Sequence, residues 1–351
     1  MLTENSHLRG ERGKNMIEKK KVIIDCDTGS DDSVALVLAM LRPEFEILGI
    51  TTVNGNRCVE YTTENTLRVV EFMGNKWPVF KGCGLPYVST MLGRRPGYPR
   101  RDGSGPANNA GVHGDFIDQL PKATIKEQDK PAVIWLIETL MAQPDHSVTI
   151  IPLAPLTNIA HAVHIEPRIV DKVKEVMYMG GGYIIGNKSA VGEMNVWMDP
   201  DAAEVCMEAG FQNWTFVPLD ATHDAYLTMD DAERIRAVGT KEAEFIADLT
   251  AQRIKGYSTW QKVKEDNAAP VHDPLTVAAL IDESVLVDCV PAHCQVDCGG
   301  GAAYGQTIFD MPAINGRLDA LPPNCRVALH ADRIKYVNWI IDTLEQAKAR
   351  S

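Results

Sequence analysis

The sequence has no uninterrupted apolar run of about 18 residues, the length that a transmembrane helix requires. It therefore predicts no membrane-spanning segment and no membrane partner. The N-terminal residues 1–20 are polar and charged and lack the apolar core of a secretory signal. We expect them to form a flexible extension, in which Met16 is a second candidate start, and we expect the protein to be cytoplasmic.

Positive charge and closely paired cysteines are also scarce. The 35 Lys and Arg residues are outnumbered by 47 Asp and Glu residues, which gives a formal net charge of -12. Because nucleic-acid-binding proteins usually carry a basic patch, this balance favours a small ligand and no nucleic-acid partner. The 8 cysteines include no CxxC pair and no dense framework of the secreted type, so we expect reduced thiols.

Strand candidates alternate with helix candidates along most of the chain. The predicted strands cover residues 21–25, 45–54, 78–82, 147–154, 175–181 and 214–220, with hairpin-like strands at 286–298. The predicted helices cover residues 33–42, 59–73, 130–142, 156–164, 200–209, 228–238, 241–256, 272–281 and 331–347. This order predicts an α/β fold with a mostly parallel central sheet flanked by helices, formed by a single domain over residues 21–351.

Polar motifs follow several of the predicted strands. They are DCDTGSDD (25–32), NGN (54–56), PLAPLTN (152–158), GGGY (180–183) and PLDATH (218–223). In open α/β sheets, ligands bind beyond the carboxyl ends of the strands, so these motifs are the first candidates for a site. The stretch 83–112, which is rich in Gly, Pro and Arg, is predicted to be an active-site loop.

Four aspartates lie close together at the first predicted turn from strand to helix, namely Asp25, Asp27, Asp31 and Asp32. Their mutual repulsion would raise some of their pKa values unless a cation intervenes. Residues 30–40 contain no lysine or arginine, so a bound Ca²⁺ or Mg²⁺ is the simplest local answer. The alternative is that Asp31 or Asp32 only caps the helix, which would explain one or two of the four.

Two later segments add candidate residues. The loop 186–200 carries the hydrogen-bonding side chains of Asn187, Glu193, Asn195 and Asp199. Such a set suits sugar hydroxyls, although Asx turns that stabilise the loop are an alternative. The VHDP motif (271–274) places an imidazole beside a carboxylate at a helix start, where a simple cap is again an alternative.

Taken in order, these motifs, with TTVNGN, MGGGY and GEMNVWMDPDAA, resemble those of the inosine-uridine-type nucleoside hydrolase family. The resemblance covers roughly residues 21–340. It implies a Rossmann-like nucleoside hydrolase domain and calcium-dependent hydrolysis of the N-glycosidic bond of ribonucleosides to ribose and free base. It also implies a homodimer or homotetramer.

The family signature DxDxGxDD is complete in this chain. The resemblance implies that Asp27 and Asp32 bind Ca²⁺, with Asp273 as a third carboxylate ligand. The backbone carbonyl of Leu153 would contribute a further oxygen. Some members have threonine at the position of Leu153, a difference that a backbone ligand tolerates. Asp25 would support the site as a neighbour of the ligands.

The resemblance also implies a set of substrate-binding residues. The ribose would be bound by Asp31, Asn56, Asn187, Glu193 and Asn195. His113 matches a second pocket histidine that part of the family has. Where the usual continuation is HGxxGL, this chain has HGDFID, so the local loop around His113 departs from the family pattern.

Breaking the N-glycosidic bond places positive charge on the ribose and negative charge on the departing base. Asp27 would accept the proton of a calcium-bound water that attacks the anomeric carbon. His272 would assist the departure of the base, because imidazole titrates near neutral pH. Tyr257 or Trp260 would either stack on the base or simply pack at a helix end.

Other functions remain open at this level. A phosphatase of the haloacid-dehalogenase type also begins with an Asp-x-Asp pair, but its pattern requires threonine or valine where this chain has Gly29. A non-catalytic nucleoside-binding relative has no need of a water-activating base, so Asp27 and His272 argue against it. A hydrolase for a modified nucleoside would belong to the same reaction class. The base preference depends on residues 83–115 and 222–270 and stays open.

Overall fold

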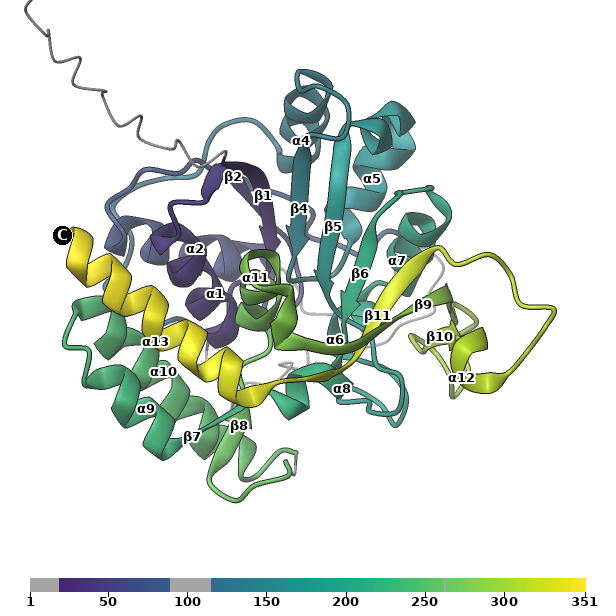
Figure 1. Ribbon diagram of the computed structural model, residues 1–351. Helices are drawn as coiled ribbons and strands as arrows, with labels where there is room; N and C mark the ends of the chain where they lie inside the picture. Colours follow the sequence, from purple (N-terminus) through teal and green to yellow (C-terminus); the bar gives the residue numbers. More distant parts are fainter. Residues whose placement is uncertain (1–18, 89–114, 262) are drawn as a thin grey trace, which may run out of the picture.

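The computed structural model describes residues 19–88, 115–261 and 263–351. A nine-stranded sheet forms its centre, and helices cover both faces (Figure 1). The strands are β1 (Lys20–Cys26), β2 (Phe45–Thr52), β3 (Val79–Lys81), β4 (Val148–Pro152), β5 (Val173–Met179), β6 (Trp214–Val217), β9 (Leu286–Val296), β10 (Thr307–Asp310) and β11 (Cys325–Ala331). Their order in the sheet is β10-β9-β11-β6-β5-β4-β1-β2-β3.

The strands from β11 to β3 in this order pair in parallel, and β9 and β10 add an antiparallel edge. This confirms the predicted α/β fold with a mostly parallel sheet. A second, two-stranded sheet pairs β7 (Tyr226–Thr228) with β8 (Ala268–Pro270). None of the helices in the described ranges is long and apolar enough to span a membrane.

The helices follow the strands as the alternation predicted. They are α1 (Ser30–Leu41), α2 (Val59–Phe72), α4 (Ala132–Met141), α5 (Thr157–Ile165), α6 (Met194–Met198), α7 (Pro200–Glu208), α8 (Leu219–Asp224), α9 (Met229–Arg236), α10 (Lys241–Tyr257), α11 (Asp273–Ile281), α12 (Pro312–Asn315) and α13 (Arg333–Arg350). Two short 3₁₀ helices lie at Pro167–Lys172 and Glu283–Val285.

Two apolar cores lie on the two faces of the sheet. In β1, Val22, Ile24 and Cys26 belong to one core, whereas Ile23 belongs to the other. This split follows from strand geometry, because successive side chains point to opposite faces. The first core includes α1, α2, α10, α11 and α13, and the second includes α4, α5 and α7. Because helices cover both faces, the central strands are buried. The carboxyl ends of the parallel strands all lie at the same end of the sheet.

One prediction about the chain after α11 needs revision, and a prediction about the N-terminus lies largely outside the described residues. The hairpin expected at 286–298 is wrong, because β9 is one continuous strand of 11 residues. The glycine-rich turn comes after this strand, at 299–301, and the antiparallel partners β10 and β11 follow later in the chain. The predicted N-terminal extension lies outside the described residues except for Lys19 and Lys20, and Lys20 already begins β1.

Candidate active site

The carboxyl ends of β1, β2, β4 and β5 meet beside a narrow pocket of about 30 Å³. Eight of the predicted site residues line it: Asp31, Asn56, Leu153, Asn187, Glu193, Asn195, His272 and Asp273. Trp260, which the sequence offered as a candidate to stack on the base, also lines it, together with three residues that were not predicted for the site: Met179, Met194 and Arg253. The motifs that follow separate strands are therefore brought together at the position that parallel sheets use for ligands.

A compact group of carboxylates lies at the base of this pocket. Oxygen atoms of Asp31, Asp32 and Asp273 lie within 4.8 Å of one another, and all three side chains are buried. Asp273 begins α11, so a carboxylate that is remote in sequence lies beside the acidic turn. Asp27 is not a member of this group of three, but its backbone N–H donates to Oδ1 of Asp32 at 3.2 Å.

Asp27 is oriented by the segment after β2. The backbone N–H of Asn56 donates to its Oδ2 at 2.5 Å, and the side-chain amide of Asn56 donates to the backbone carbonyl of Asp27 at 3.3 Å. The other oxygen of Asp27, Oδ1, is buried and has no hydrogen-bond partner among the described residues. A Cβ atom on Gly55 would lie only 1.9 Å from Oδ2 of Asp27, so this close approach requires glycine.

Asp32 caps a helix and also lies in the carboxylate group. It caps α1, because its Oδ2 accepts the backbone N–H of Gly29 at 2.9 Å. It also lies in the carboxylate group, and an ionised carboxylate has enough lone pairs to accept these bonds and still bind a cation.

The charge balance of the group favours a bound cation. Burial, together with the charges of the neighbouring aspartates, raises the pKa of Asp32 to about 7 and the pKa values of Asp27 and Asp273 well above the usual range. A divalent cation would hold these carboxylates ionised at neutral pH. The oxygen-only donor set and the unpartnered Oδ1 of Asp27 fit a hard cation such as Ca²⁺.

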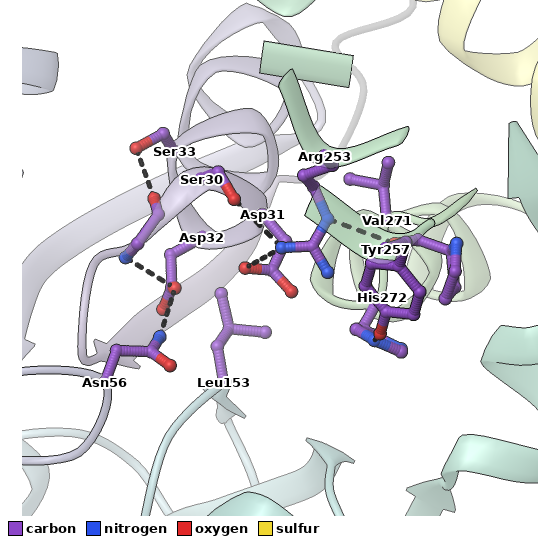
Figure 2. A network of polar contacts seen from close by, with 12 residues as sticks. Ser30, Asp31, Asp32, Ser33, Asn56, Leu153, Arg253, Tyr257, Val271 and His272 are labelled. Carbon is purple, nitrogen blue, oxygen red and sulfur yellow. Dashed lines mark hydrogen bonds and ion pairs between the residues drawn. The ribbon is translucent and has the colours of Figure 1, made fainter. Parts of the chain in front are cut away.

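Arg253 of α10 is a buried, pocket-lining residue that the sequence did not point to. Its Nη1 lies 3.0 Å from Oδ1 of Asp31 and 2.9 Å from Oγ of Ser30, and its Nε donates to the carbonyl of Pro270 at 3.1 Å (Figure 2). The side chain is only 1% exposed. Arg253 is more than 200 residues from the acidic turn along the chain, and the sequence signal for it is its spacing of four from Tyr257 on one helix.

His272 is held at both ring nitrogens. Its Nδ1 lies 2.7 Å from Oγ1 of Thr222, and its Nε2 lies 2.6 Å from Oη of Tyr257. The guanidinium of Arg253 lies over the Tyr257 ring, 5.5 Å from its centroid, so Arg253 connects the acidic turn with the histidine (Figure 2). Tyr257 is thus buried against His272, whereas Trp260 lines the pocket.

The opposite wall is built by the loop before α6. Glu193 caps this helix, accepting the N–H groups of Asn195 at 2.8 Å, Gly181 at 2.9 Å and Val196 at 3.1 Å. Burial raises the pKa of Glu193 to about 7, against the lowering effect of these bonds. The side-chain amide of Asn195 donates to the carbonyl of Leu153 at 3.0 Å. Glu193 and Asn195, two of the predicted ribose residues, therefore share one hydrogen-bond network with the predicted backbone ligand Leu153.

Some candidate residues support the site from farther away. Asn187 stabilises the loop as well as lining the pocket, because its Oδ1 accepts the N–H of Met194 at 2.9 Å. Asp199 does not line the pocket; it caps α7 and accepts a hydrogen bond from Thr157. Asp25 is buried behind the acidic turn, where its Oδ1 accepts the amide of Asn158 at 2.7 Å. His113 lies outside the described residues.

Known proteins with similar sequences and structures indicate which family has a site of this kind. The sequence profile described as "Inosine-uridine preferring nucleoside hydrolase" matches residues 22–338. The chain belongs to this family. This nucleoside hydrolase is 37% identical over 335 residues to the inosine-uridine preferring nucleoside hydrolase of Leishmania major, covering 93% of this chain and 98% of that protein. Its identity to the protein of the same name from Crithidia fasciculata is 36% over 336 residues, with the same coverage of 93% and 98%.

A solved structure supports the same assignment. The purine-preferring ribonucleoside hydrolase from Gardnerella vaginalis superimposes with a TM-score of 0.80 at 29% identity, covering 95% of this chain and all of that one. This chain is therefore an N-glycosidase that hydrolyses ribonucleosides. The phosphatase and non-catalytic alternatives are set aside by these relatives.

Proposed function

We propose that this nucleoside hydrolase depends on calcium, held by Asp27, Asp32, Asp273 and the backbone carbonyl of Leu153. The observation that carries this proposal is the buried carboxylate group beside the unpartnered Oδ1 of Asp27. When bound, the ion would neutralise the group and supply the Lewis acidity that lowers the pKa of water. The remaining chemistry falls to side chains of the chain itself.

Asp27 is the proposed general base. Its Oδ2 is fixed by the N–H of Asn56 at 2.5 Å, which leaves Oδ1 to take a proton from the attacking water. The fixed carboxylate would orient that water toward the anomeric carbon, and such positioning reduces the entropic part of the barrier.

His272 is the proposed proton donor to the departing base. Thr222 and Tyr257 fix the plane of the ring by bonds at both nitrogens. Burial raises the pKa of Tyr257, so the phenol stays protonated at neutral pH and can donate its proton toward Nε2. Tyr257 would orient the His272 ring through this contact, and the proton that reaches the departing base would come from a protonated His272.

Asp31, Asn56, Asn187, Glu193 and Asn195 are the proposed ribose-binding residues, and His113 is a proposed second pocket histidine. The first five line the pocket. Because an unpaired polar group in a closed site is costly, we expect deoxyribonucleosides to be poor substrates.

The relatives suggest which nucleosides to test first. The Leishmania and Crithidia proteins are named as inosine-uridine preferring, whereas the Gardnerella structure is named as purine-preferring. We propose inosine and uridine as substrates of this chain. We also propose a cytoplasmic, homo-oligomeric enzyme; a reducing compartment is supported by the 8 free cysteines.

A panel of ribonucleosides, assayed for released base with and without a calcium chelator, tests the proposal. We expect release from inosine and uridine that stops with the chelator and returns when calcium is added. Activity that persists in the chelator would overturn the metal assignment. Release from other nucleosides alone would overturn the proposed preference.

A further inference from the structure

The side chain of Gln261 joins the two loops that flank the pocket. Its Nε2 donates to the backbone carbonyl of Gly186 at 3.1 Å. Trp260 and Asn187, the chain neighbours of these two residues, both line the pocket. A single amide therefore connects the wall that carries Trp260 with the wall that carries the proposed ribose residues.

The acceptor end of this contact is a compact turn. The N–H groups of Asn187, Lys188 and Ser189 all donate to the carbonyl of Gly192, at 3.2, 3.0 and 3.3 Å. A Cβ atom on Gly186 would lie 2.4 Å from the carbonyl oxygen of Ser189, so only glycine fits here. The Gly186 carbonyl is thus presented by a turn that is fixed by its own backbone bonds.

The donor end follows directly from α10. The N–H groups of Trp260 and Gln261 both donate to the carbonyl of Tyr257, at 3.0 and 3.2 Å. The rings of Tyr257 and Trp260 meet edge to face at 5.1 Å. Because Tyr257 also contacts His272, this turn places Trp260 on the side of the pocket where the base would leave.

The side-chain amide of Gln261 also has an oxygen, Oε1, that could accept a hydrogen bond. Oε1 of Gln261 is buried and has no hydrogen-bond partner among the described residues. Leaving a buried acceptor unpaired costs roughly 1–3 kcal/mol, so a residue that served packing alone would be better replaced by an apolar one. The amide is therefore best explained by its donation to Gly186.

We propose that Gln261 is a positioning residue for base recognition, which by bonding Gly186 holds Trp260 against the base of a bound nucleoside. The proposal rests on the proposed placement of ribose and base in this pocket. The nucleobase would then contact the turn that follows α10, which carries Trp260. The ribose would contact the opposite side of the pocket, at Asn187 and Glu193.

Two substitutions test this assignment. Gln261→Glu keeps an acceptor but cannot donate to the Gly186 carbonyl, and Gln261→Met keeps the length without either function. We expect both to raise KM for inosine or uridine about 3- to 10-fold, the equivalent of one lost hydrogen bond, with kcat changed less than about 3-fold. The inhibition constant of free ribose should stay the same, because ribose has no base to contact.

The matched control is Gln252→Met on α10, which removes a surface hydrogen bond with Gln119 and should leave every constant unchanged. Unchanged KM in both Gln261 variants would overturn the proposal, and so would equal weakening of ribose and nucleoside. If the parent protein released no base at all, the proposed function would fail first. In that case the affinity of inosine for the parent protein and for the two Gln261 variants, measured by calorimetry, would still test the role of Gln261.

Discussion

Nη1 of Arg253 lies 3.0 Å from Oδ1 of Asp31, so a buried arginine of α10 meets the acidic turn at the start of α1. The same guanidinium lies over the ring of Tyr257, which contacts His272. One side chain thus links the proposed metal end of the pocket to the proposed leaving-group end (Figure 2).

Loss of Arg253 should therefore destabilise the protein strongly. Arg253→Met leaves the Asp31 carboxylate buried without its ion partner, and breaking such a buried pair costs about 3–5 kcal/mol. Urea denaturation of the chelated protein measures this loss. The double variant with Asp31→Asn should recover part of it, because the unpaired charge is then gone. If the two losses simply add, the proposed coupling between these residues is absent.

The contrast between Arg253 and the aspartates shows what the sequence could reveal. Asp27, Asp31 and Asp32 were recognisable because a strand-to-helix turn keeps them close along the chain. Asp273 was found through the resemblance rather than through its neighbours. Arg253 could not be placed, because its partner is fixed by how α10 packs beside α1, which depends on the whole first core. Residues 30–40 contain no lysine or arginine, but this did not exclude a positive side chain beside the aspartates, because Arg253 reaches Asp31 from α10.

A similar limit applies to the fold. The parallel strands were predictable because each is a short apolar run followed by a helix. The register of β9 was not, because its partners β10 and β11 are separated from it by irregular segments and pair with it across the sheet edge. The short α6 was hidden in a polar loop and depends on the cap that Glu193 provides.

Asp27→Asn should nearly abolish hydrolysis while the fold is retained. The amide has almost the same shape but cannot accept the proton of the attacking water, and general-base catalysis contributes typically 10²- to 10⁴-fold. Base release per enzyme is measured with saturating calcium and inosine. The control is Asp230→Asn on the exposed face of α9, which should behave as the parent. Parental turnover in the Asp27 variant would remove Asp27 from the mechanism.

His272→Ala should lower kcat far more than it raises KM, because it removes assistance to the leaving base rather than the grip on ribose. Tyr257→Phe removes the hydroxyl 2.6 Å from Nε2 of His272 and should lower kcat about tenfold. Both variants should recover with a nitrophenyl riboside, whose leaving group needs no proton. Equal losses on this substrate and on inosine would indicate damage to the ribose site instead.

The stability of the chelated protein should fall as the pH rises from about 5 to about 8. The folded-state pKa of Glu193 is about 7 against an ordinary value of 4.5, so in this window the folded state binds more protons than the unfolded state. A raised acid pKa therefore stabilises the fold at low pH, and this contribution is lost as pH approaches 7. Asp32, with a pKa of about 7, acts in the same direction.

Glu193→Gln isolates this effect, since glutamine does not titrate. Thermal melts of the chelated variant should show a shallower fall in Tm between pH 5 and pH 8 than those of the parent. Calcium should reverse the trend in the parent, because the ion binds ionised carboxylates and so raises Tm more at pH 8 than at pH 5. Identical pH slopes in parent and variant would mean that Glu193 is ionised throughout this range. The three backbone N–H groups that donate to its carboxylate would then be sufficient to keep it charged.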